Sequence, residues 1–193
     1  MRGFGLASIV SLTASLACGS GTDLNQIVNV NPTSEAGVGS GEGGAGTPFP
    51  NPFGGAPGYV AHMGQDAHNP GQSCIQPQCH GGSEAPPFLI GGTVYADYKG
   101  TTPAAGVEVR ILDSAGHAAS TYSGQNGNFF IPSGSANGVT FPAIVGARNA
   151  STLRPMITKL STASMGSCGQ AKCHVPGGGP QGNTGNYYPI HVP

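Results

Sequence analysis

The sequence predicts a mainly β fold, a small antiparallel sandwich flanked by irregular segments. Residues 88–149 contain several short runs rich in β-branched and aromatic residues, and turn-forming stretches such as DSAG and SGQNGN separate them. A period of two in such a run places one face on a core and leaves the other in water. One run shows this alternation, Val107, Val109 and Ile111 against Glu108 and Arg110. Short strands at this spacing favour a sandwich.

The same region resembles the carboxypeptidase-regulatory-like domains. GGTVYAD and TPAAGVEVRILDSAG match that family's G-x-V and P-x-x-G-V-x-V steps, and TYSGQNGNFFI resembles its T-x-x-x-G-x-F step. The resemblance implies a seven-stranded, immunoglobulin-like sandwich that serves as a scaffold or spacer. It implies no catalytic residues, and no Ser-His-Asp pattern or phosphate-binding loop stands out elsewhere in the chain.

The composition limits both the partners and the core. With seven Lys and Arg and a net charge of −1, the chain carries no basic stripe, so nucleic acid is not an expected partner. Glycine (34) and proline (17) make up about a quarter of the 193 residues, and there is no tryptophan. A chain so poor in large apolar side chains needs hydrophobic bulk from elsewhere, or stays partly unfolded.

The N-terminal residues predict export. Residues 1–17 place one arginine before a mostly apolar run that ends in small residues, the layout of a signal peptide. Cys18 follows directly, and the junction resembles the lipobox of bacterial lipoproteins, although Ser15 stands where that family prefers leucine. The resemblance implies lipidation of Cys18 and a lipid anchor in the membrane, whereas plain cleavage would leave a free thiol. Residues 18–57, rich in small and polar residues, are expected to form a flexible linker.

Two copies of a Cys-x4-Cys-His motif account for the other four cysteines. CIQPQCH lies within an irregular segment, 58–87, and CGQAKCH lies within a second one, 150–193. Covalent attachment of haem needs two thiols for the two vinyl groups and a base that reaches the iron, an arrangement usually met by Cys-x-x-Cys-His. The residues concerned are Cys74, Cys79 and His80 in the first copy, and Cys168, Cys173 and His174 in the second.

The longer spacing resembles a variant found in multihaem c-type cytochromes. That resemblance implies two covalently bound haem c groups with His80 and His174 as the proximal iron ligands, and each ring would supply apolar surface that the chain lacks. Disulfides within the pairs are an alternative in an exported chain, but they close small loops and leave the histidines unexplained. Zinc is another alternative, but the side chains of adjacent Cys79 and His80 diverge on an extended backbone.

Other side chains are candidates for the distal side of the irons. HNPGQSC before the first motif and the C-terminal IHVP resemble stretches of exported dihaem proteins. This resemblance implies His68 and His191 as distal ligands. His62 is the runner-up for the first haem. His117 follows DSAG in an expected hairpin turn and is predicted to lie at the surface. Met156 precedes the second motif, and we expect it to pack against a ring edge rather than bind iron.

Together these features predict an electron-transfer protein of the cell envelope, in the outer membrane or outside the cell. Its expected partners are other redox proteins or further copies of the chain, which would stack into haem-conducting filaments. The alternative is a non-redox surface lipoprotein whose sandwich binds a glycan or another ligand. In that case the cysteines form disulfide or zinc clips.

Overall fold

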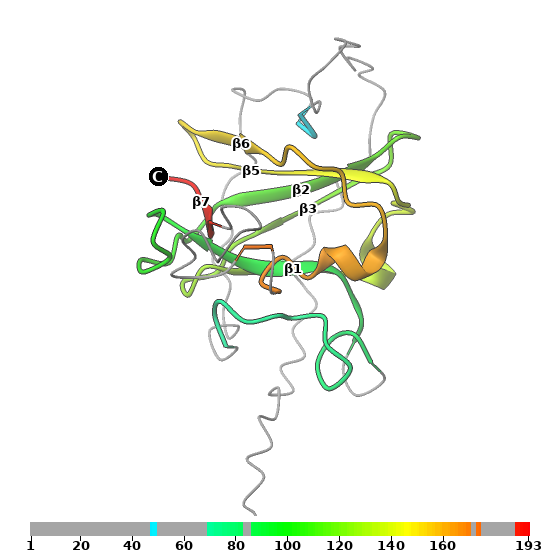
Figure 1. Ribbon diagram of the computed structural model, residues 1–193. Helices are drawn as coiled ribbons and strands as arrows, with labels where there is room; N and C mark the ends of the chain where they lie inside the picture. Colours follow the sequence, from blue (N-terminus) through cyan, green and yellow to red (C-terminus); the bar gives the residue numbers. More distant parts are fainter. Residues whose placement is uncertain (1–46, 50–68, 83–85, 171–172, 175–187) are drawn as a thin grey trace, which may run out of the picture.

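Two facing β-sheets form the described part of the chain (Figure 1). The computed structural model describes residues 47–49, 69–82, 86–170, 173–174 and 188–193. One sheet has the strand order β4-β1-β7 and the other the order β3-β2-β5-β6. The strands are β1 (Phe88–Tyr95), β2 (Glu108–Asp113), β3 (Ala118–Tyr122), β4 (Asn128–Pro132), β5 (Ala143–Arg148), β6 (Leu153–Pro155) and β7 (Ile190–His191). The predicted mainly β fold is confirmed.

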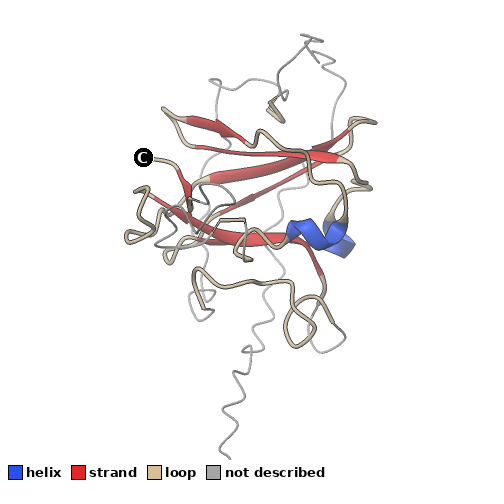
Figure 2. Cartoon of the chain, in the orientation of Figure 1, coloured by secondary structure: helices blue, strands red, loops and turns tan. Residues whose placement is uncertain are grey.

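Helical structure within the described residues is limited to two short 3-10 turns, Ser133–Ser135 and Ala163–Gly166 (Figure 2). No helix in these ranges has the length and apolarity needed to cross a bilayer. Cys18, His62 and His68 lie outside the described residues.

Apolar side chains fill the space between the two sheets. Val107, Val109 and Ile111 are all buried there, as the alternating pattern predicts. The other large core residues include Ile90, Val94, Phe129, Ile131, Val145 and Leu160. Cys168 is part of the same cluster, so one cysteine of the second motif belongs to the core of the sandwich.

Two strands come from the C-terminal segment rather than from residues 88–149. β6 pairs antiparallel with β5, and β7 pairs parallel with β1 through Val94–Ile190 and Tyr95–His191. Strands of three and two residues are too short to show a periodicity, so no pattern in the sequence marks them. As a result, His191 lies in the edge strand β7, on the side of β1 opposite β4.

The charged face of β2 is buried, and the prediction that it lies in water is wrong. Glu108 is 2% exposed and Arg110 is 9% exposed. Arg148 of β5, directly opposite Glu108 in the register, donates from Nε to Glu108 Oε2 at 2.7 Å. Residues 47–49 cover these groups from outside (Figure 1). They belong to the expected linker 18–57, of which the structure describes no other residue.

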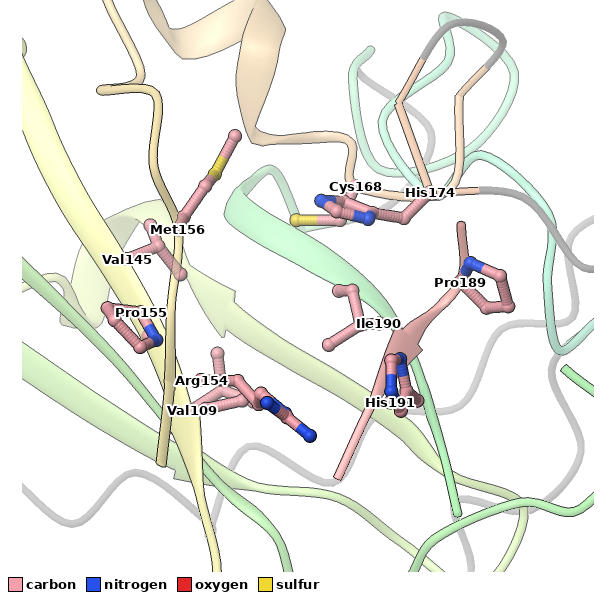
Figure 3. Close-up of a pocket in the computed structure, with 12 residues that line it drawn as sticks. Val109, Val145, Arg154, Pro155, Met156, Cys168, His174, Pro189, Ile190 and His191 are labelled. Carbon is pink, nitrogen blue, oxygen red and sulfur yellow. The ribbon is translucent and has the colours of Figure 1, made fainter. Parts of the chain in front are cut away.

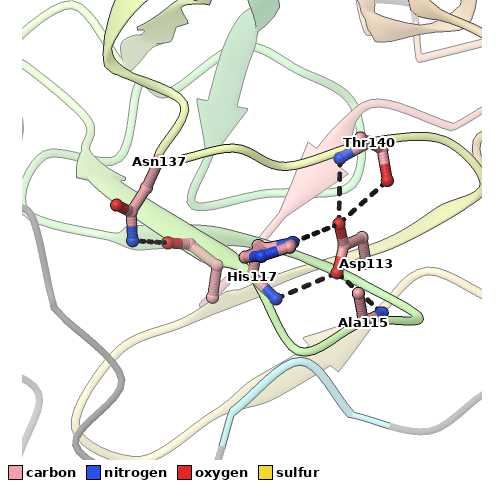
Figure 4. Close-up of polar contacts among 6 residues, drawn as sticks. Asp113, Ala115, His117, Asn137 and Thr140 are labelled. Carbon is pink, nitrogen blue, oxygen red and sulfur yellow. Dashed lines mark hydrogen bonds and ion pairs between the residues drawn. The ribbon is translucent and has the colours of Figure 1, made fainter.

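Asp113 organises the hairpin between β2 and β3 (Figure 4). Its carboxylate accepts hydrogen bonds from the N–H groups of Ala115 and His117, both at 2.9 Å, and from His117 Nδ1 at 3.0 Å. Thr140 donates its N–H and its hydroxyl, both at 3.0 Å. Burial alone would raise the pKa of Asp113, but these hydrogen bonds outweigh it and hold the pKa well below its usual range. The His117 side chain is half exposed, as expected for a hairpin turn.

We expect Asp113→Ala to lower the free energy of unfolding by about 2–3 kcal/mol, because the buried donors around the carboxylate lose their acceptor. The folded carboxyl has a lower pKa than the unfolded one, near about 3.9. Its contribution is therefore present at neutral pH and is lost as the pH falls below about 4. Asp113→Asn is the matched control, since it keeps the size but cannot ionise. Urea unfolding at neutral pH and at acid pH measures the free energy of unfolding of each variant and its pH dependence. If the Asn variant loses as much stability in acid as the native chain, Asp113 is not the source of the pH dependence.

Candidate functional site

Both Cys-His motifs fold into the same backbone turn. The histidine N–H donates to the carbonyl of the first cysteine, and the N–H of the second cysteine donates to a glutamine carbonyl three residues before it. The distances are 3.1 Å (His80–Cys74) and 2.9 Å (Cys79–Gln76) in the first motif, and 2.8 Å (His174–Cys168) and 3.0 Å (Cys173–Gln170) in the second. Each turn brings the backbone of its histidine back beside its first cysteine.

The repeat is longer than the motif from which it was predicted. A serine precedes the first cysteine and a glutamine follows it by two positions in both copies, so the shared pattern is Ser-Cys-x-Gln-x-x-Cys-His. The sequence shows these matches, but only the structure gives them a role. The glutamine carbonyls close the turns. The serines join the two copies, because Ser73 Oγ and Ser167 Oγ lie 2.6 Å apart and Ser167 Oγ also accepts the N–H of Ile75 at 3.2 Å.

The two motifs lie against neighbouring glycines of β1. A Cβ at Gly91 would stand 3.2 Å from Cys74 Cβ, and a Cβ at Gly92 would stand 2.8 Å from Cys168 Cβ. Successive residues of a strand point to opposite faces. The first motif therefore lies on the outer face of its sheet, while Cys168 enters the core. The N–H of Cys168 donates to the carbonyl of Gly91 at 2.9 Å, which ties the second motif to the free edge of β1.

Both motif histidines use Nδ1 in the same way. His80 Nδ1 lies 2.9 Å from the carbonyl oxygen of Pro86, and His174 Nδ1 lies 2.8 Å from that of Tyr188. A carbonyl can only accept, so Nδ1 carries the proton and the lone pair of the neutral ring is on Nε2. This is the arrangement that metal-bound histidines commonly adopt. Burial lowers the pKa of His174, against the opposing effect of the Tyr188 hydrogen bond, and favours the neutral ring.

His80 is held by aromatic stacking as well as by its hydrogen bond. Its ring lies 3.6 Å from the ring of Phe88, with an interplanar angle of 8°, and Phe88 stacks in turn on Phe130 at 4.4 Å. Phe88 and Phe130 belong to the paired strands β1 and β4. His80 is 6% exposed, so its orientation is fixed by the outer face of the sheet.

A cavity of about 160 Å³ lies beside the second motif (Figure 3). Cys168 and His174 line one end of it and His191 lines the other, with Ile190 between them. Met156 also lines the cavity. The structure thus brings together one predicted proximal ligand and one predicted distal ligand. Pockets for drug-sized ligands measure about 300–1,000 Å³, so this cavity can admit only the edge of a tetrapyrrole unless its walls move.

The cysteines differ in state and in burial. Cys74, Cys168 and Cys173 are free thiols, whereas Cys79 is disulfide-bonded. Neither motif therefore closes on itself through a disulfide between its own cysteines. Burial raises the pKa of the Cys168 thiol to about 12 and that of Cys74 to about 11, so both thiols are protonated at neutral pH.

His117, held by Asp113, does not line this cavity. Among the described residues, no group of three or more His, Cys, Asp or Glu side chains is placed to hold a metal ion. The sequence did not reveal that the two motifs pack on Gly91 and Gly92. It also did not reveal the two backbone carbonyls that accept from the histidines. Only the glycine pair has a local signal, because glycine inside a strand often marks a close approach of other backbone.

No protein-family model, no curated protein and no solved structure matches this chain. The resemblances to c-type cytochromes and to carboxypeptidase-regulatory-like domains therefore rest on the motifs themselves. Fold and site together define a mainly β protein in which two matching Cys-His turns share one strand.

In the native, haem-free chain, we expect Cys173 to react with iodoacetamide at least tenfold faster than Cys168. The reason is access: Cys168 is 6% exposed and packs in the core, whereas Cys173 is only partly buried. Peptide mass spectrometry over a time course measures both rates. A Cys173→Ser variant is the control, since the label at Cys168 should remain slow in it. Equal rates in the folded chain would contradict the placement of Cys168.

Proposed function

We propose that this chain is an exported electron-transfer protein that carries two covalent haem c groups, one on each Cys-His turn. Its partners are other redox proteins or further copies of the chain. A lipid at Cys18 would hold it at the cell envelope, in the outer membrane or on the outside of the cell. The observation that carries the proposal is the duplicated turn, in which both histidines present Nε2 as the basic nitrogen.

The residues of each turn suit the chemistry of attachment. A thiol adds across a vinyl group, with sulfur bonding to one carbon and hydrogen to the other, so the step consumes no oxidant or reductant. Four thiols serve four vinyl groups, and Cys79 must be reduced before it can take part. The bound iron would supply a one-electron couple, with its potential set by the axial ligands. Backbone carbonyls of the chain orient the two imidazoles. The Pro86 carbonyl holds the ring of His80, and the Tyr188 carbonyl holds the ring of His174.

The second site offers two candidates for the far side of the iron. His191 and Met156 both line the cavity next to His174. The sequence resemblance implies His191 as the distal ligand, and methionine in that place would raise the potential relative to a second histidine. Ile190 lies between His174 and His191, so pairing of these two rings on one iron requires the Ile190 side chain to move (Figure 3).

A non-redox surface module is the second candidate function. It is favoured by the disulfide at Cys79 and by the role of Cys168 as a core residue. In that case the sandwich is the functional unit and the Cys-His turns are structural.

Haem stoichiometry separates the two candidates. We expect the full chain, made in a host with cytochrome-maturation machinery, to give a pyridine haemochrome spectrum of two haems per chain that survive acid-acetone extraction. A Cys74→Ala/Cys79→Ala variant and a Cys168→Ala/Cys173→Ala variant should each retain one. His117→Ala is the matched control and should retain both, since this histidine lies away from the turns. A colourless, folded full chain would leave only the structural module.

Distal ligation of the second haem has its own test. Loss of His191 should leave one iron five-coordinate, so His191→Ala should convert about half of the low-spin signal to high spin. Electron paramagnetic resonance of the oxidised protein measures this conversion. Met156→Leu keeps the packing and should leave the spectrum unchanged. If His191→Ala has no effect and Met156→Leu does, methionine and not histidine is the ligand.

A further inference from the structure

Three aromatic rings form a continuous stack on the outer face of the three-stranded sheet. The imidazole of His80 lies 3.6 Å from the ring of Phe88 at an interplanar angle of 8°, and Phe88 lies 4.4 Å from Phe130 at an angle of 7°. This is the face on which the first Cys-His turn lies (Figure 1). The stack therefore connects the histidine of that turn to the two paired strands β1 and β4.

Residues 86–88 hold His80 at three points. The Pro86 carbonyl accepts from His80 Nδ1 at 2.9 Å, and the N–H of Phe88 donates to the His80 carbonyl at 3.0 Å. The third point is the ring of Phe88, which covers one face of the imidazole. Ring centroids of aromatic pairs usually lie about 4.5–7 Å apart, so a separation of 3.6 Å is a close, nearly face-to-face contact. The imidazole cannot turn about its Cβ–Cγ bond without driving an edge into the Phe88 ring.

Phe88 is itself fixed by the sandwich. It pairs with Pro132 in the register of β1 and β4, and the N–H of Ser133 donates to the carbonyl of Pro87 at 2.8 Å. The ring of Phe130 lies against its other face. With an imidazole on one side and a phenyl ring on the other, the Phe88 side chain transmits the order of the sheet to the histidine.

The histidine of the second turn is held differently. His174 Nδ1 lies 2.8 Å from the Tyr188 carbonyl oxygen, but no ring in the described part of the chain stacks on it. Its side chain lines the cavity of about 160 Å³ instead, so the ring borders open space (Figure 3). The two turns match in sequence and in backbone hydrogen bonds, but among these residues only the first has an aromatic support for its imidazole.

We propose that Phe88 is a positioning residue, which fixes the direction in which the His80 ring presents Nε2. Where iron is concerned, this role rests on the function proposed above. The axial imidazole of the first haem would then have one fixed orientation, whereas that of the second would be held by a hydrogen bond alone. Groups that orient a metal-bound histidine also tune the metal. The two haems would therefore differ in spectrum although their motifs match.

Ring dynamics in the haem-free, full-length chain test the positioning role by itself. With carbon-13 in the histidine rings, NMR relaxation gives an order parameter for each ring. We expect the His80 ring of the native chain to be rigid, with an order parameter of about 0.85, and that of Phe88→Leu to fall below about 0.6. Phe88→Tyr keeps the stack and should keep the ring rigid. The His174 ring should be the same in all three chains, which makes it an internal control.

A rigid His80 ring in folded Phe88→Leu would overturn the proposal, because the hydrogen bond to Pro86 would then be sufficient. Phe88→Ile keeps the proposal testable if Phe88→Leu does not fold. Its β-branched side chain suits a strand and has no ring, so it should loosen His80 to the same extent. The amide spectrum of the sandwich reports whether each variant is folded.

The effect on iron is measured separately. Electron paramagnetic resonance of the oxidised, haem-loaded chain should show two low-spin signals, and Phe88→Leu should shift or broaden one of them. Phe88→Tyr should restore that signal, and the other should be unchanged in both variants. If Phe88→Leu loosens the His80 ring in the haem-free chain but changes neither signal, Phe88 does not position an iron ligand and the proposal is overturned. A chain that takes up no haem would instead contradict the proposed function, and the ring measurement would still decide whether Phe88 holds His80.

Discussion

The close approach of two loops to the glycine pair of β1 is the constraint on which the arrangement of both Cys-His turns depends. Cys74 packs on Gly91 from outside and Cys168 packs on Gly92 from inside. A Cβ at Gly92 would clash with Cys168 Cβ at 2.8 Å, and a Cβ at Gly91 would crowd Cys74 Cβ at 3.2 Å. Overpacking a core commonly costs about 1–3 kcal/mol, and here it would also separate the turns from the strand. The serine contact between Ser73 and Ser167 adds to this constraint, because it fixes one turn relative to the other.

The outer face of the other sheet shows a different way to stabilise a chain with little apolar bulk. Burial of Glu108 with Arg110 and Arg148 is expensive unless the charges are paired and hydrogen-bonded. The pairing is nearly complete here, and the cover comes from a segment that is distant in sequence. A chain without tryptophan therefore gains a second buried layer from Arg148 stacked on Phe49 and from Arg110 bound to the Pro48 carbonyl, rather than from a larger core.

The two-sheet fold was predictable from the sequence because strand alternation and turn residues are local signals, and Val109 and Ile111 follow them. The burial of Glu108 and Arg110 was not, because it depends on residues 47–49, some sixty positions earlier in the chain. The same limit applies to the site. The Cys-His spacing marks the turns, but no local pattern shows that the carbonyls of Pro86 and Tyr188 orient the histidines. His191 reaches the cavity through a strand too short for any periodicity.

The buried state of Cys168 bears on when a cofactor would be attached. Its thiol packs in the core with a pKa near 12, so it is neither accessible nor ionised in the folded chain. A tetrapyrrole bonded at this position must also occupy more space than the cavity of about 160 Å³ provides. Both facts favour attachment before the sheets close, while the turn and β1 are still apart. The order of assembly would then decide the state of the chain. A turn that packed on β1 first would bury its cysteine in the core, and a turn that bound the proposed haem first would have the ring in place of that contact.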